Sequence, residues 1–364
     1  MRKILAIAAT GALALTMTGC GRSTESSAKG DIASGTKGTI GVAMPTKTLQ
    51  RWIKDGSAMK TQLEAAGYKV NLVYANDDVP TQVTQVNDMV TKANQVLVVA
   101  AIDGTALAGS LKQAKEAGIP VIAYDRLLLS TKAVDYYATF DNLRVGELQG
   151  KSLVAGLKAS GKPAPWNVEL FAGSPDDNNA TFFFKGAMKV LQPLIDSKQI
   201  VIPSRETSFK TIATRGWDAG VSKMRMENIL TKSYTRSDVQ GVLAPNDGLA
   251  RGIIAALKGT GYGSGAKKMP VITGQDAEIE SVKSILAGEQ YSSVFKDTSK
   301  LAAATVTMIK QIAEKKTVTS NDTTSYNNGV KVVPTMLLQP VSIDKANIKK
   351  ILLDAKYYTA AEMG

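Results

Sequence analysis

The strongest constraint on the fold is an alternation of short apolar runs with longer amphipathic runs, which begins at Thr39. Nine apolar runs predict β-strands, at residues 39–44, 70–74, 95–101, 120–124, 136–140, 167–172, 239–244, 270–273 and 291–295. These runs lack an alternation of polar residues, so both faces of each strand should be buried, as in a parallel sheet between helices. The sequence therefore predicts an α/β fold with doubly wound parallel sheets.

The segments between these strands have the apolar spacing of helices. Helices are expected at residues 52–66, 79–92, 106–117, 145–158, 181–194, 217–230, 248–258, 279–286 and 300–315. Gly67, Gly118 and Gly259 each follow one of these segments directly, where a left-handed residue commonly closes a helix. A predicted strand follows each glycine, which supports the alternation of strand and helix.

Five of the predicted strands end close to a polar pair. The pairs are Asp125-Arg126, Asp141-Asn142, Asn246-Asp247, Gln275-Asp276 and Lys296-Asp297. Open parallel sheets bind ligands outside the carboxyl ends of their strands, so these pairs predict a polar cleft. Carboxylates, amides and cations suit a neutral polyhydroxylated ligand, because hydroxyl groups both donate and accept hydrogen bonds.

The amino-terminal segment predicts export. Arg2 and Lys3 precede the apolar run 4–15, which is followed by Thr18-Gly19-Cys20. This is the pattern of a secretory signal with a lipoprotein-type cleavage box, so residues 1–19 are expected to be removed. The run is too short to span a bilayer core of about 30 Å. Cys20, the single cysteine of the chain, would become a lipid-modified first residue that anchors the protein outside the cytoplasm, at a bacterial cell surface or in the periplasm.

Residues 20–37 are rich in Ser, Gly and Thr and predict a flexible tether between this anchor and the folded body. The chain that follows is longer than the 250–300 residues, roughly, at which a single core stops growing. Polar strand ends occur in both halves of it. We therefore expect two lobes that face a shared crevice, in preference to one large sheet.

Composition removes several classes of function. The chain contains no histidine, which excludes the commonest general base and the usual zinc ligands. The net charge is +12, or +10 once Arg2 and Lys3 are removed with the signal. The basic pairs Lys267-Lys268 and Lys315-Lys316 are short and are not interleaved with aromatic residues, so nucleic acid is not the expected partner.

A set of short motifs occurs in order along the chain after the tether. They are GVAMPT (41–46), RW (51–52), IDGT (102–105), IAYDR (122–126), YATFDN (137–142), GSPDDNN (173–179), PND (245–247), GQDA (274–277) and VFKD (294–297). This set resembles the type I periplasmic binding proteins for pentoses and hexoses, and most closely the multiple-sugar-binding receptor and xylose-binding protein group.

The resemblance implies a binding protein and not an enzyme, without cofactor or metal, that acts as a monomer. Two lobes, residues 38–141 with 297–325 and residues 142–296 with 326–364, would close over one aldose such as glucose, galactose, xylose or arabinose. Three crossing segments near Asn142, Asp297 and Ser325 would form the hinge. An ABC-type permease would receive the sugar.

The resemblance also assigns roles to residues at the strand ends. Asp125 would accept hydrogen bonds from sugar hydroxyls, and Arg126 and Arg51 would donate to them through planar guanidinium groups. Trp52 would offer an aromatic face to the sugar ring. The expected sugar-binding set is completed by Asn142, Asn179, Phe182, Asn246, Asp276 and Lys296.

Two choices concern aromatic residues. Phe182 or its neighbour Phe183 would form an aromatic wall opposite Trp52, and we select Phe182. Trp217 and Phe209 stand in contexts that fit packing as well as binding, so they are not counted.

Three other interpretations compete with a transport role. Asp125 and Asp276 are candidates for the paired acids of a glycosidase, but each is expected beside a cation that would keep it ionised. A transcription regulator with a similar two-lobed sensor would carry a DNA-binding segment where this chain has its export signal. A receptor that presents bound sugar to a membrane kinase or chemoreceptor is the alternative that the sequence does not separate from transport.

Overall fold

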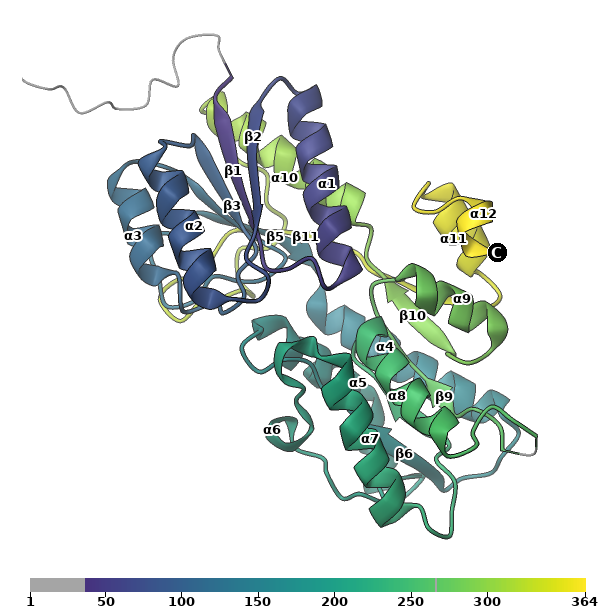
Figure 1. The fold of residues 1–364 in the computed structure, drawn as a ribbon. Coiled ribbons are helices and arrows are strands. Elements are labelled where there is room, and N and C mark those ends of the chain that lie inside the picture. Colours follow the sequence, from purple (N-terminus) through teal and green to yellow (C-terminus); the bar gives the residue numbers. More distant parts are fainter. Residues whose placement is uncertain (1–36, 266) are drawn as a thin grey trace, which may run out of the picture.

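The computed structural model describes residues 37–265 and 267–364 of the chain. The predicted signal, the predicted lipidation site Cys20 and all of the predicted tether except Lys37 lie outside the described residues. Within the described ranges, no helix is both long and apolar enough to cross a membrane. The described chain folds into two lobes, which Figure 1 shows one above the other.

The first lobe contains a six-stranded parallel sheet with the order β11-β5-β4-β3-β1-β2. Its strands are β1 (Thr39–Met44), β2 (Lys69–Tyr74), β3 (Val96–Val99), β4 (Val121–Tyr124), β5 (Tyr136–Phe140) and β11 (Thr335–Leu338). Its helices are α1 (Gln50–Ala65), α2 (Val79–Thr91), α3 (Ala108–Glu116) and α10 (Thr298–Ala313).

Both faces of this sheet are buried, as the apolar strand runs predict. Val96 and Val98 of β3 pack in one core with residues of α1 and α10, whereas Leu97 and Val99 pack in a second core with residues of α2 and α3. Side chains alternate between the two faces of a strand, so one apolar run packs against a helix layer on each face of the sheet. Because all six strands are parallel, their carboxyl ends lie at the same edge of the sheet.

The second lobe repeats the pattern around a four-stranded parallel sheet with the order β7-β6-β8-β9. The strands are β6 (Trp166–Leu170), β7 (Ile200–Val201), β8 (Gly241–Leu243) and β9 (Val271–Ile272). The helices are α4 (Asn142–Ala159), α5 (Asn178–Asp196), α6 (Phe209–Ile212), α7 (Ala219–Ser233), α8 (Asp247–Gly259), α9 (Ile279–Ala287), α11 (Ile348–Asp354) and α12 (Ala360–Met363), with a 3₁₀ turn η1 (Arg215–Trp217).

An antiparallel pair extends this sheet beyond β9. β10 (Ser292–Phe295) and β12 (Val341–Asp344) pair with each other, and the backbone N–H of Val294 donates to the Gly274 carbonyl just after β9 at 3.1 Å. The expectation of parallel sheets is thus confirmed for both central sheets, with this one antiparallel addition at an edge.

Three crossings join the lobes. The chain passes from β5 to α4 at Asp141, from β10 to α10 at Lys296 and Asp297, and from β11 to β12 at 339–340. The expected third crossing near Ser325 is wrong, because β11 pairs with β5 in the first lobe, with Leu338 beside Phe140. Residues 326–338 therefore belong to the first lobe and not, as expected, to the second.

Candidate ligand-binding site

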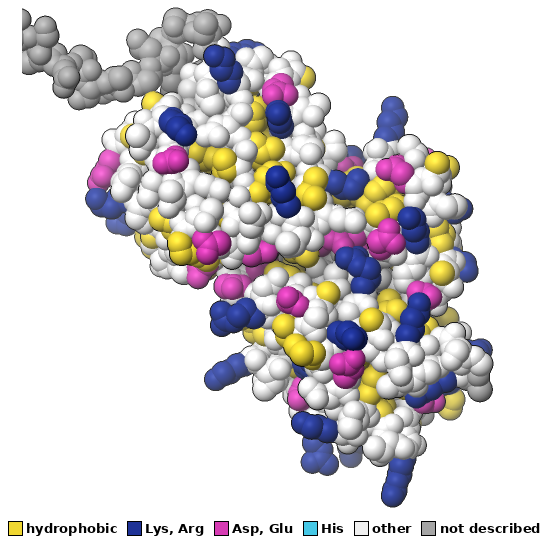
Figure 2. Space-filling model, viewed as in Figure 1, with side chains coloured by type: hydrophobic (Ala, Val, Ile, Leu, Met, Phe, Trp, Pro, Cys, Tyr) yellow, Lys and Arg dark blue, Asp and Glu magenta, His cyan; other side chains and the backbone are white. Residues whose placement is uncertain are grey.

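A cavity lies between the lobes, where the strand ends of both sheets meet. The first lobe lines it with Leu49, Arg51, Trp52, Asp125 and Arg126, and the second with Asp177, Asn179, Phe183, Trp217, Asn246, Gln275 and Asp276, while Lys296 reaches it from a crossing. In Figure 2, acidic side chains gather along the boundary of the lobes.

Eight of the ten residues that the sequence singles out line this cavity. They are Arg51, Trp52, Asp125, Arg126, Asn179, Asn246, Asp276 and Lys296. Asn142 and Phe182 do not line it. The strand-end pattern therefore located the cavity and most of its polar groups.

Arg51 lies in the first turn of α1 and is held on two sides. Its Nε and Nη2 donate to Oδ2 of Asp55 at 3.0 and 2.8 Å. Nη2 also lies 3.0 Å from Oδ2 of Asp125. The guanidinium carbon is 4.2 Å from the centre of the Trp52 ring, and that of Arg126 is 5.1 Å from it, so Trp52 packs against both cations.

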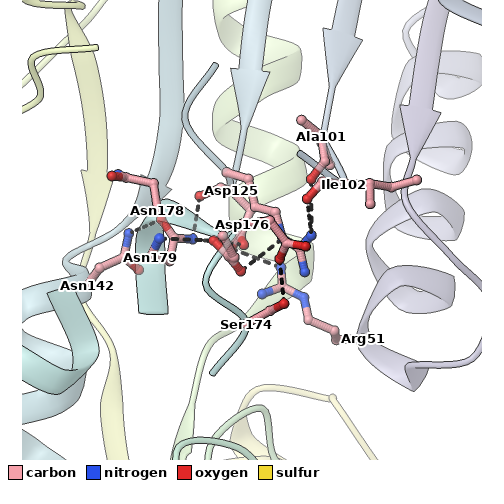
Figure 3. Close-up of polar contacts among 12 residues, drawn as sticks. Arg51, Ala101, Ile102, Asp125, Asn142, Ser174, Asp176, Asn178 and Asn179 are labelled. Carbon is pink, nitrogen blue, oxygen red and sulfur yellow. Dashed lines mark hydrogen bonds and ion pairs between the residues drawn. The ribbon is translucent and has the colours of Figure 1, made fainter. Parts of the chain in front are cut away.

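Asp125 follows β4 in a left-handed conformation, with φ of 58°. Its carbonyl oxygen accepts from Asn179 Nδ2 at 2.8 Å (Figure 3). It also accepts from Tyr137 Oη at 2.5 Å and Thr139 Oγ1 at 2.9 Å, and these bonds hold the uncommon turn. Burial opposes ionisation of the carboxyl, but Arg51, Lys296 and Arg126 outweigh it and lower the pKa of Asp125. The side chain is therefore an ionised acceptor.

Arg126 is fixed by backbone groups of its own lobe. Its Nη1 donates to the carbonyls of Ala101 and Ile102 at 3.1 and 3.3 Å (Figure 3). Its Nε lies 3.0 Å from Oδ2 of Asp177, across the cavity in the second lobe. Burial raises the pKa of Asp177, and Arg126 opposes this change. The pair links the two walls directly.

The second-lobe carboxylate Asp276 has the left-handed φ of 94° after β9. Lys296 Nζ lies 3.1 Å from its Oδ1 and 4.0 Å from Oδ2 of Asp125, and Lys296 is only 2% exposed. One buried ammonium group thus compensates a carboxylate from each lobe, as a buried charge requires.

The neutral polar groups of the second-lobe wall are amides. Asn246 caps α8, because its Oδ1 accepts from the backbone N–H of Leu249 at 3.0 Å. Its amide nitrogen is not used by that cap. Gln275 Oε1 is buried and has no hydrogen-bond partner among the described residues.

Asn142 and Phe182 differ from the expectation. Asn142 is fully buried at the start of α4, where its Nδ2 donates to Oδ1 of Asn179 at 3.0 Å, so it holds a cavity residue instead of facing the cavity. Phe182 packs on Tyr326 of the first lobe, with ring centres 5.6 Å apart. Successive helix residues point about 100° apart, and it is Phe183 that turns to the cavity.

Trp217 is a cavity residue that the sequence reasoning left out. It lies in η1 with φ of 54°, and its ring covers Gly173 so closely that a Cβ there would lie 2.0 Å from it. Phe183 packs edge-on against it at 6.3 Å. The indole nitrogens of Trp217 and Trp52 are both buried without a partner among the described residues.

Asp177, Gln275 and Leu49 are the other cavity residues missed. Asp177 and Gln275 lie within two residues of a selected residue, in the polar motifs GSPDDNN and GQDA. Selecting every polar residue of those motifs would have included them. Leu49, just before α1, carries no signal of this kind.

The cavity presents ionised groups of both signs, amides and two aromatic walls. Such a set can donate to and accept from many hydroxyl groups while rings cover the less polar faces of a ligand. No cluster of three or more His, Cys, Asp or Glu side chains suited to a metal ion occurs within residues 37–265 and 267–364.

Comparison with known proteins gives consistent relatives. A family model described as "Periplasmic binding protein domain" matches residues 40–317. The multiple sugar-binding periplasmic receptor ChvE of Rhizobium radiobacter is 53% identical, over 90% of this chain and 92% of that protein. The D-xylose-binding periplasmic protein of Escherichia coli K12 is 35% identical, over 89% and 92%.

A solved structure agrees with these relatives. An ABC transporter solute binding protein from Clostridium phytofermentans with bound β-D-glucose matches with a TM-score of 0.85 and 44% identity, and the match covers 90% of this chain and all of that one (100%).

Proposed function

This chain belongs to the periplasmic binding protein family, and from that premise we propose that it captures one aldose between its lobes and delivers it to an ABC importer. The observation that carries the proposal is the cavity itself. It combines buried ion pairs from both lobes with aromatic walls at the boundary of the two lobes.

The energetics favour a ligand with many hydroxyl groups. A sugar leaves water only if most of its hydroxyls find new partners, since each unpaired buried group costs about 1–3 kcal/mol. The cavity offers carboxylate acceptors in Asp125 and Asp276, cationic donors in Arg51 and Lys296, and the amide of Asn246. Closure around the sugar is a hinge motion about the three crossings, because ligand contacts to both walls favour the closed form.

The two carboxylates that the sequence offers as paired acids, Asp125 and Asp276, argue against turnover. A glycosidase needs one carboxyl group that is protonated at working pH. Burial disfavours the charged form of Asp125, but its three neighbouring cations lower the pKa, and Asp276 is paired with Lys296 at 3.1 Å. We therefore propose binding without chemical change.

A titration panel tests the proposal. We expect heat of binding at one site per molecule for at least one of D-glucose, D-galactose, D-xylose and L-arabinose, measured by calorimetry on the purified protein. Glycerol and a disaccharide serve as size controls. The absence of a response to every aldose overturns the proposal, and release of product from aryl glycosides would replace it with an enzymatic function.

The location and partners are part of the same proposal. We place the protein outside the cytoplasm, held to a membrane by lipid on Cys20. A Cys20→Ser variant should lose label from an alkyne-tagged fatty acid and leave the membrane fraction; unchanged labelling would refute the anchor. The similar solved structure is an ABC transporter solute binding protein, so delivery to a permease is proposed in preference to presentation to a membrane sensor.

A further inference from the structure

Asp55 is a buried carboxylate next to the cavity that does not line it. It lies one helical turn after Arg51 on α1 and is 0% exposed. Its Oδ2 accepts both Arg51 bonds, and its Oδ1 accepts from Tyr124 Oη at 2.6 Å. Tyr124, at the end of β4, is also fully buried. A carboxylate in this place contributes only through the groups it holds.

The arrangement leaves one part of the Arg51 guanidinium free. Its Nε bonds Asp55, and its Nη2 is shared between Asp55 and Asp125. Nη1 lies 3.8 Å from Oδ1 of Asp276, which is too long for a hydrogen bond. Among the described residues, Nη1 is therefore the nitrogen of Arg51 without a hydrogen bond, and Arg51 lines the cavity.

We infer that Asp55 and Tyr124 form a positioning pair that orients Arg51 so that its Nη1 faces the ligand. The inference rests on the proposed sugar-binding function and adds to it two residues that the ligand does not touch. Tyr124 fixes one oxygen of Asp55, and this leaves the other oxygen to receive both Arg51 bonds. The guanidinium is then held through Nε and Nη2, and its Nη1 is left to donate to the ligand.

The protonation states agree with this geometry. Burial, followed by the charge of Asp55, raises the pKa of Tyr124, so its hydroxyl remains a donor. Burial raises the pKa of Asp55, while Arg51 opposes the change. If Asp55 were absent, Arg51 would be free to turn fully toward Asp125 or Asp276 and to use up the nitrogen that now faces the cavity.

A double-mutant cycle measures whether Asp55 acts through Arg51. With D-glucose as the probe, we expect Asp55→Ala to weaken binding about tenfold or more in the parent protein and less than about twofold in an Arg51→Met background. Tyr124→Phe should weaken it about threefold, because Arg51 still anchors Asp55. Glu64→Ala, which removes an exposed carboxylate from the same helix, is the matched control and should change nothing.

Equal losses in both backgrounds, or no loss in the parent, would overturn the inference. Asp55→Asn keeps the side-chain volume and replaces the alanine variant if that variant fails to fold.

A second readout needs no sugar and separates this inference from the proposed function. In ¹⁵N-labelled ligand-free protein, the Arg51 Nε–H should be protected from exchange with solvent, with the signal assigned by its loss in Arg51→Met. Asp55→Ala should expose that proton to exchange while Glu64→Ala does not. An unchanged, protected Arg51 signal in Asp55→Ala refutes the positioning role, whether or not any aldose binds.

Discussion

The two walls of the cavity are built differently. The first-lobe wall consists mainly of charged groups tied to their own lobe: Arg51 to Asp55, and Arg126 to the carbonyls of Ala101 and Ile102. The second-lobe wall has more neutral groups. Two of them, Trp217 Nε1 and Gln275 Oε1, are buried without partners among the described residues, as is Trp52 Nε1 of the first-lobe wall.

This difference suggests a division of labour in binding. Groups tied within one lobe keep their orientation when the lobes separate, so the first-lobe wall is organised before the ligand arrives. The second-lobe wall completes hydrogen bonds and ring contacts on closure. Affinity should therefore depend most on the first-lobe charges and less on the second-lobe rings.

The largest effect is expected for Asp125→Ala. The change removes an ionised acceptor and leaves Arg51, Arg126 and Lys296 without their shared counter-charge, so sugar affinity should fall at least about 100-fold. Calorimetry measures the affinity and a thermal melt checks folding. Asp88→Ala, an exposed carboxylate on α2, is the control. Tight binding by a folded Asp125→Ala protein would break the contrast between the walls.

A smaller loss is expected for Trp217→Ala. An aromatic face that covers the ligand contributes about 1.5–3 kcal/mol by burial, so affinity should fall about 10- to 100-fold, while Trp217→Phe keeps most of it. The comparison between alanine and phenylalanine variants separates ring contact from the indole N–H. A loss larger than that of Asp125→Ala would reverse the proposed division between the lobes.

The sequence predicted those site residues that come just after a strand. Asp125, Asp276 and Lys296 each come within four residues of a strand, and the carboxyl ends of parallel strands necessarily share an edge. Trp217 escaped this rule because it lies in a short turn before α7, held by a left-handed backbone and by contact with Gly173. Neither property can be read from spacing along the chain.

The fold was predicted where helix and strand alternate and was missed where they do not. β11 and β12 are four residues each and are joined by a two-residue link, Gln339-Pro340, with no helix between them. Without that helix, the pattern gave no reason to assign β11 to the first sheet. The error in the third crossing follows from this one omission, since the strands of one sheet are defined by pairing and not by order.

A pH titration of stability separates two buried carboxylates, Asp247 of the second lobe and Asp125 of the first. Burial, with Glu278 nearby, raises the pKa of Asp247 to about 8. Because the folded state then binds a proton more tightly than the unfolded state, whose carboxyl has a pKa of about 4, stability should fall as pH rises from about 4 to 8. The pKa of Asp125 is lowered, so its contribution is lost only on acidification and adds no slope in this range.

The measurement is the melting temperature against pH. We expect several degrees of decline between pH 5 and 8 in the parent protein and a flatter profile in Asp247→Asn, where no group titrates at this position. The slopes are compared, and not the absolute melting temperatures, because the amide changes the hydrogen bonds from Gln290 and Ser293. Equal slopes in the two proteins would show that Asp247 is ionised throughout the range.

The smallest effect is expected outside the cavity, at a contact between α1 and the carboxyl-terminal segment. Lys54 Nζ lies 4.3 and 4.1 Å from the ring centres of Tyr357 and Tyr358, and the chain there packs with α9 and β10 of the second lobe. Lys54 lies on α1 of the first lobe and does not line the cavity. This contact therefore bridges the lobes without touching the ligand. A cation–π contact at a half-exposed site is worth about 0.5–1 kcal/mol, so Lys54→Met should weaken sugar binding two- to fivefold. If the contact favours the closed form, the loss is the same for every aldose that binds; a loss that differs between sugars would instead mean that Lys54 acts on the cavity.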